Sequence, residues 1–166
     1  MIYLICNILS ILSLSAMGFI IYHGLTYDIF NESVIQDYQN HLEWAFATIF
    51  LYAFTISLVM FYFIGSGKRV KELIVYYKLD KKEYDKVLNI KRTFFPPITI
   101  NLVLVCTAFF LFGAVDALKI NKWWYHSFSF IGFLHYAYVF YLQLFAFKED
   151  VDILESIGKQ IDKNGN

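Results

Sequence analysis

Histidines are the residues of this chain whose chemistry best suits a metal or haem site. His23 lies at the end of the first long apolar run, His41 lies just before the second, and His126 lies at the start of the fourth. If the apolar runs cross a membrane in alternating directions, these three residues reach a similar depth, and a first helix beside the second and fourth brings them together. His23, His41 and His126 are therefore the candidate metal ligands.

Imidazole nitrogens bind zinc, copper or iron, and two histidines on facing helices can ligate haem axially. The carboxylates expected near the same end of the helices are Asp28, Asp37, Glu43 and Asp116. No HExxH or similar spacing is present, so the hypothesis depends on the expected convergence of the helices. The alternative is that these histidines are ordinary amphipathic residues at the membrane surface.

His135 lies near the middle of the fourth apolar run. Ionisable residues at bilayer depth are rare and usually face a bundle interior or a cavity. His135 is therefore a candidate for cofactor binding, as are His23 and His126. One alternative is a hydrogen bond across the bundle, with Tyr52, Thr55 or Thr107 as the expected partner. Another is a place in a proton path with the tyrosines of the same run.

Four apolar runs are each long enough to cross a bilayer as a helix. They cover residues 1–22, 44–64, 98–115 and 123–147, which together with their connections form the predicted membrane domain. The chain is 58% hydrophobic, against about 45–50% in soluble domains. The first run lacks the basic start of a signal peptide, so we read it as a retained helix. We predict an all-α integral membrane protein with four transmembrane helices in an up-down bundle.

A basic segment, residues 65–97, separates the second run from the third and is called the hinge below. It carries nine of the fourteen Lys and Arg residues. Because short loops rich in Lys and Arg stay in the cytoplasm, both termini are predicted to be cytoplasmic, in a bacterial or archaeal membrane. Apolar spacing predicts two short helices in the hinge. Asp80 and Glu83 are expected to cap the second helix as a capping-box variant, and Pro96 and Pro97 are expected to end it.

Residues 148–166, the tail, are predicted to form a cytoplasmic amphipathic helix. Its apolar stripe contains Ile153, Leu154, Ile157 and Ile161, on a segment with excess acidic residues. We expect this stripe to pack on the hinge, with the opposite charges of the two segments assisting. The candidate partner-docking residues are Lys68, Arg69, Lys81, Lys82, Ile153, Leu154 and Ile157.

No nucleophile–base pair is evident, and Cys6 and Cys106 lie within apolar runs without a CxxC motif. Topology accounts for the basic residues, so nucleic-acid binding is not predicted. The leading hypothesis is a non-catalytic membrane subunit or accessory protein of a larger assembly, such as a respiratory or other redox complex, with the bilayer and other membrane subunits as partners. The first alternative is an electron-transfer protein that binds haem or a transition metal. The second is a small transporter or channel.

Overall fold

The computed structural model describes residues 2–26, 30, 35–118 and 120–164. Four helices account for nearly all of them: α1 (Ile2–Thr26), α2 (Ile35–Tyr77), α3 (Lys82–Leu118) and α4 (Trp123–Asn164). Each helix is long and apolar enough to cross a membrane. The prediction of an all-helical chain with four such helices is therefore confirmed.

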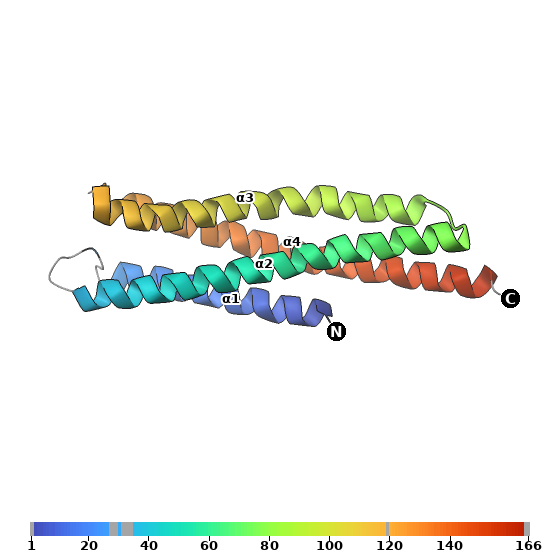
Figure 1. The fold of residues 1–166 in the computed structure, drawn as a ribbon, viewed down its shortest axis with the longest axis horizontal. Helices are drawn as coiled ribbons and strands as arrows, with labels where there is room; N and C mark the ends of the chain where they lie inside the picture. Colours follow the sequence, from blue (N-terminus) through green and yellow to red (C-terminus); the bar gives the residue numbers. More distant parts are fainter. Residues whose placement is uncertain (1, 27–29, 31–34, 119, 165–166) are drawn as a thin grey trace.

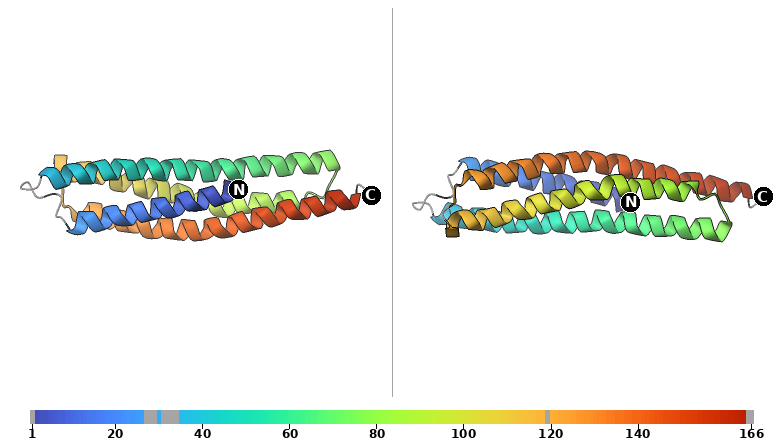
Figure 2. Two further views of the ribbon diagram at one scale, coloured as in Figure 1. Left: turned by 90° about the horizontal axis from the view of Figure 1, so that it is seen from below. Right: turned by 90° about the horizontal axis from the view of Figure 1, so that it is seen from above.

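The helices lie side by side in an elongated bundle (Figures 1 and 2). α2, α3 and α4 run along most of its length, whereas α1 covers only one half, so that the N-terminus lies midway along the bundle. At 1.5 Å per residue, the 43 residues of α2 extend about 65 Å, roughly twice the hydrocarbon thickness of a bilayer. The part with four helices is called the apolar half below. The part with three helices is called the stalk, and it consists of the hinge and residues 148–164 of α4.

The hinge is not a pair of separate short helices, because its two helical stretches continue α2 and α3. Val70 and Ile74 extend the buried face that Val59 and Phe63 begin in the apolar half, so one packed face runs through the boundary. α2 ends where Lys78 takes a positive φ of 53° and Leu79 N–H donates to Ile74 O at 3.0 Å. This pairing is a Schellman-type helix end.

The prediction that Pro96 and Pro97 end a helix is wrong, since α3 continues through both residues. Each proline removes one N–H, and the carbonyls that lose a donor belong to Arg92 and Thr93. Both of these residues are on the exposed side of α3. The buried side holds Phe94 and Ile98 in the core, and neighbouring helices commonly stabilise a membrane helix that contains proline.

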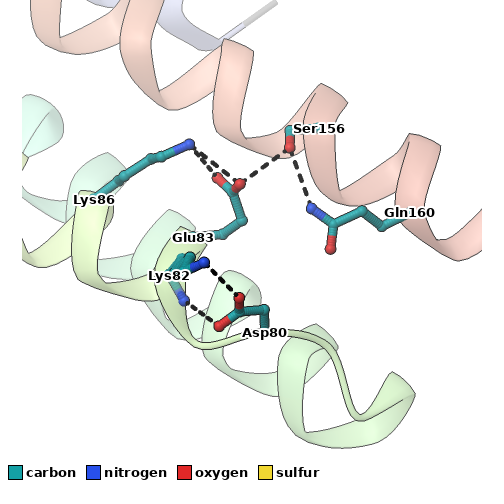
Figure 3. A network of polar contacts seen from close by, with 6 residues as sticks. All are labelled: Asp80, Lys82, Glu83, Lys86, Ser156 and Gln160. Carbon is teal, nitrogen blue, oxygen red and sulfur yellow. Dashed lines mark hydrogen bonds and ion pairs between the residues drawn. The ribbon is translucent and has the colours of Figure 1, made fainter.

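Asp80 caps α3 as predicted, but Glu83 does not complete a capping box. Asp80 Oδ1 accepts the backbone N–H of Lys82 at 3.1 Å, and this bond lowers the pKa of the Asp80 carboxyl below its usual value. Glu83 instead accepts from Lys86 Nζ at 3.1 Å and from Ser156 Oγ at 3.2 Å (Figure 3). Glu83 therefore links α3 to the tail part of α4.

The tail packs on the hinge, as its apolar stripe predicted. Ile153 and Ile157 are 3% and 1% exposed and belong to the same core as Val70, Ile74 and Val87. α4 reaches this position without a break after the apolar half. The expected attraction between opposite charges does not take the form of ion pairs between the described residues of the two segments. Among the described residues, the ion pairs of the stalk each join two residues of the same segment, for example Lys159 with Glu155.

Candidate functional site

His41 of α2 is fully buried where all four helices meet near the end of the apolar half. Its Nδ1 lies 3.4 Å from Nδ1 of His23 on α1, and its Nε2 lies 2.7 Å from the hydroxyl of Tyr125 on α4. Phe112 of α3 packs on the imidazole, with ring centres 5.2 Å apart. We call His23, His41, Phe112 and Tyr125 the histidine layer.

His126 lies beside this layer on α4. Its ring centre is 5.2 Å from that of Tyr125 and 6.2 Å from that of Phe30. The structure thus brings His23 and His41 into direct contact and places His126 at the edge of the same aromatic cluster. Sequence reasoning identified the three histidines but missed Tyr125, which follows two tryptophans and directly precedes His126.

The described residues do not contain a group of three or more His, Cys, Asp and Glu side chains that could hold a metal ion. Both ring nitrogens of His41 already face a neighbour, Tyr125 or His23. Asp28 and the side chain of Asp116 lie outside the described residues, so their expected role as ligands has no structural description. The metal hypothesis therefore gains no support from the part of the chain that the structure describes.

A cavity of about 70 Å³ lies between the histidine layer and the middle of the apolar half, and all four helices line it. Tyr125 and Phe112 line one end, and Tyr52 and Gly132 line the other. A cavity of about 150 Å³ is needed for benzene, whereas a water molecule needs about 10–15 Å³. The cavity is therefore smaller than one that holds benzene and far too small for haem, and its lining is mostly apolar, with Thr48, Tyr52 and Ser129 as its polar residues.

A second buried polar layer joins α2, α3 and α4 next to this cavity. The Tyr52 hydroxyl donates to Asn101 Oδ1 at 2.6 Å, and Asn101 Nδ2 donates to the Gly132 carbonyl at 2.9 Å. The Tyr52 ring also meets the ring of Tyr136 edge-on, with centres 5.0 Å apart. Tyr52 and Asn101 are fully buried, so their polar atoms satisfy one another inside the bundle.

Further polar contacts attach α1 to its neighbours. Ser13 Oγ lies 3.0 Å from Thr55 Oγ1 on α2. Gln143 of α4 accepts from Ser10 Oγ at 3.1 Å and donates to Asn7 Oδ1 at 2.9 Å. Hydrogen bonds of this kind between membrane helices contribute about 1–2 kcal/mol or less each. The arrangement fits a role in helix packing.

His135 does not line the cavity and does not make the hydrogen bonds expected for it. Tyr52 bonds to Asn101 instead, and Thr55 bonds to Ser13. His135 Nδ1 is buried without a hydrogen-bond partner among the described residues, and its ring lies 5.9 Å from that of the exposed Tyr138. Nine residues separate His135 from His126, about 13 Å along a helix, so the two do not form one site.

At the junction with the stalk, Asp150 is a buried carboxylate that sequence reasoning missed. It accepts hydrogen bonds from the Tyr62 hydroxyl at 2.9 Å and from Ser66 Oγ at 2.7 Å, both on α2. Its sequence signal was its spacing, because Asp150 precedes the buried Ile153 and Ile157 by three and seven residues and so shares their helix face. Asp150 fixes the position of α4 against α2 at this level.

The candidate docking residues separate into two groups. Lys68, Arg69, Lys81 and Lys82 are exposed on the stalk. Ile153 and Ile157 are buried against the hinge and Leu154 is partly buried there, so the tail's stripe is occupied by this chain itself. Sequence reasoning missed the apolar residues that are exposed at the end of α2. They are Val75, Tyr76 and Tyr77, at 71%, 79% and 41% exposure.

Comparison of the chain with protein-family models, with curated proteins and with solved structures found no match. Its function is therefore inferred from the residues and their geometry. The histidine layer, the polar layers and the small cavity form the interior of the apolar half, while the end of the stalk exposes the apolar and basic residues.

Tyr125→Phe is expected to lower the free energy of unfolding by about 1–3 kcal/mol, because it leaves Nε2 of the buried His41 without a partner. Reversible unfolding in detergent micelles measures the change. Tyr141→Phe is the matched control, since Tyr141 lies on the exposed face of the same helix. An equal, small effect of both substitutions would show that the Tyr125–His41 bond does not stabilise the histidine layer.

Proposed function

We propose that the chain is a non-catalytic integral membrane subunit or accessory protein, whose apolar half anchors a cytoplasmic stalk that docks another subunit. In this proposal the four helices form an up-down bundle with both termini in the cytoplasm. A respiratory or other redox complex is a suitable setting for such a subunit. The excess of Lys and Arg in the hinge supports this orientation.

The exposed end of the stalk carries the proposal. Val75 and Tyr76 are two of the most exposed large apolar side chains of the described chain, yet they lie beyond the apolar half. Exposed aromatic and apolar residues surrounded by charge are typical of protein interaction sites. Lys68, Arg69 and Lys71 lie on the same exposed side of α2. The matching partner surface would offer an apolar pocket with an acidic rim.

The interior of the apolar half supports the non-catalytic part of the proposal. Its polar side chains are mostly paired with one another across helices, as with Asn101 and Tyr52 or Gln143 and Ser10. The cavity between them is too small for an ordinary substrate, since ligand pockets usually measure about 300 Å³ or more. These contacts keep the helices in register, and the continuous α2, α3 and α4 carry that register into the stalk.

The proposed orientation predicts that a cysteine at Lys82 is labelled only from the cytoplasmic side. Lys82 is exposed at the turn between α2 and α3. The measurement uses a membrane-impermeant maleimide on intact cells and on inverted vesicles, in a background without Cys6 and Cys106. Labelling in intact cells would show that the orientation is opposite to the one proposed, with the stalk outside the cytoplasm.

The proposed docking predicts that a photoreactive amino acid at Tyr76 crosslinks to one defined protein in native membranes, identified by mass spectrometry. The same group at Tyr141, which is exposed on the apolar half, is the matched control and should give a different pattern. Tyr76→Ser should abolish co-purification of that protein in mild detergent without changing the melting temperature. Co-purification that survives Tyr76→Ser would exclude this end of the stalk as the docking site.

A further inference from the structure

Two cations, Lys91 and Arg92, lie on α3 at the boundary between the apolar half and the stalk. The Lys91 ammonium lies against Gly67 of α2, where a larger side chain would displace it. Arg92 follows on the exposed side of α3. Phe94, two residues further, stacks edge-on with Phe63 in the first layer of the apolar half. Lys91 and Arg92 therefore lie within one helical turn of the end of the apolar surface.

Neither cation has a carboxylate partner within the described residues. The ion pairs there use other lysines, such as Lys68 with Glu72 and Lys86 with Glu83. The buried carboxylate at this level, Asp150, is held by hydroxyl groups. An ammonium and a guanidinium that line one depression and have no ion-pair partner among the described residues attract an anion, and an arginine suits a phosphate particularly well.

A shallow depression extends from these cations along the surface of α3. Its lining residues are Lys91, Arg92, Phe95, Pro96, Thr99 and Ile100. The two charges lie at the stalk end, and the remaining lining is mostly apolar. From Arg92 to Ile100 the helix advances about 12 Å. The depression thus runs from the boundary into the surface that faces the bilayer, with charge at one end and hydrocarbon at the other.

We propose that this depression binds an anionic glycerophospholipid, with its phosphate on Lys91 and Arg92 and an acyl chain along Phe95, Pro96 and Ile100. The position and the polarity of the depression both match such a lipid in the leaflet that meets the stalk. Basic residues next to a membrane helix attract anionic lipids in this way. The apolar end distinguishes a lipid from a free phosphate, which would use only the cations. Docking of a protein on the end of the stalk is not required.

The test uses the purified full-length chain in detergent with added phosphatidylglycerol, phosphatidylcholine or inorganic phosphate. Phosphatidylglycerol should raise the melting temperature more than either alternative. Native mass spectrometry should show about fivefold weaker phosphatidylglycerol binding for Arg92→Gln, and about 25-fold weaker binding when Lys91→Gln is added. The matched control is the pair Lys159→Gln and Lys163→Gln, which removes the same charge from the far part of the tail.

Three outcomes would overturn the proposal. Equal stabilisation by inorganic phosphate would make the site an anion site without a lipid. An equal loss of phosphatidylglycerol binding in the Lys159 and Lys163 control would show that binding depends on the net charge of the chain and not on this depression. Equal binding of phosphatidylcholine and phosphatidylglycerol would show that the cations do not select the headgroup. Arg92→Gln alone keeps the test informative if the double variant unfolds, because Arg92 is exposed and outside the core.

Discussion

Phe63→Ala is expected to lower the free energy of unfolding by about 3–5 kcal/mol, the usual cost of removing a buried phenylalanine. Phe63 is almost completely buried at the boundary between the apolar half and the stalk. Its ring stacks on Phe147 of α4 with centres 5.0 Å apart, and it meets Phe94 of α3 at 5.1 Å. The alanine would leave a void in the layer that joins α2, α3 and α4.

Phe61→Ala is a close control, because Phe61 is two residues away on the same helix and 70% exposed. Lipid or detergent already surrounds that ring, so its removal should change the free energy of unfolding by less than about 1 kcal/mol. Equilibrium unfolding in mixed micelles measures both variants. Similar losses for Phe61 and Phe63 would mean that the three rings do not pack as a buried layer.

Ile157→Ala is expected to lower the free energy of unfolding by about 2–5 kcal/mol, with the destabilisation located in the stalk. Ile157 belongs to the core that also contains Val70, Ile74 and Val87 of the hinge. Since the stalk is proposed to lie in water, the substitution loses both apolar burial and packing. Hydrogen exchange should show faster opening of backbone amides in residues 65–97, with little change in the apolar half.

Val151→Ala provides the comparison on the same helix, because Val151 is partly exposed and lies outside the core cluster. It should leave exchange in the hinge unchanged within the error of the method. If Ile157→Ala behaves in the same way, the tail does not hold the hinge together. In that case the expected docking of the tail would have no energetic importance.

The tail contact could be predicted because it depends on periodicity. An apolar residue every three or four positions creates one face, and in the tail that face contains Ile153 and Ile157. The hinge, although basic, also has an apolar face, and it lies on the same side of the predicted membrane as the tail. The fold-level prediction of four apolar helices likewise rests on run length and composition alone.

The prolines show where a local rule fails. Pro96 and Pro97 disfavour a helix through the loss of two N–H donors, and this cost is visible in the sequence. The interactions that compensate for the lost hydrogen bonds are not visible in the sequence, because they come from Phe94 and Ile98 packing against other helices. Tertiary packing of this kind requires the helix register, which a single sequence does not specify.

The interior of the candidate site could be predicted only by residue type. Polar residues within the apolar runs of membrane helices usually face other helices, and Ser10 and Ser13 are both buried. Their partners were not predictable, because Gln143 lies 133 residues from Ser10. The pairing of His41 with Tyr125 was not predictable for the same reason, because the two residues lie 84 positions apart. The expected depth in the membrane predicted that His23 and His41 lie close together. Which α4 side chain contacts His41 depends on the rotation of α4 about its axis, which the sequence does not specify.

The separation between Ser10 and Gln143 has a consequence for biosynthesis. α1 is made before α4, yet Asn7 and Ser10 of α1 have their hydrogen-bond partner, Gln143, on α4. Until then Ser13 and Thr55 provide an early polar contact between α1 and α2. The ribosome must therefore make α4 as far as Gln143 before these contacts of the apolar half can form. A nascent chain that stalls before Gln143 would leave amide and hydroxyl groups of α1 unsatisfied in lipid, which makes it a natural substrate for membrane quality control.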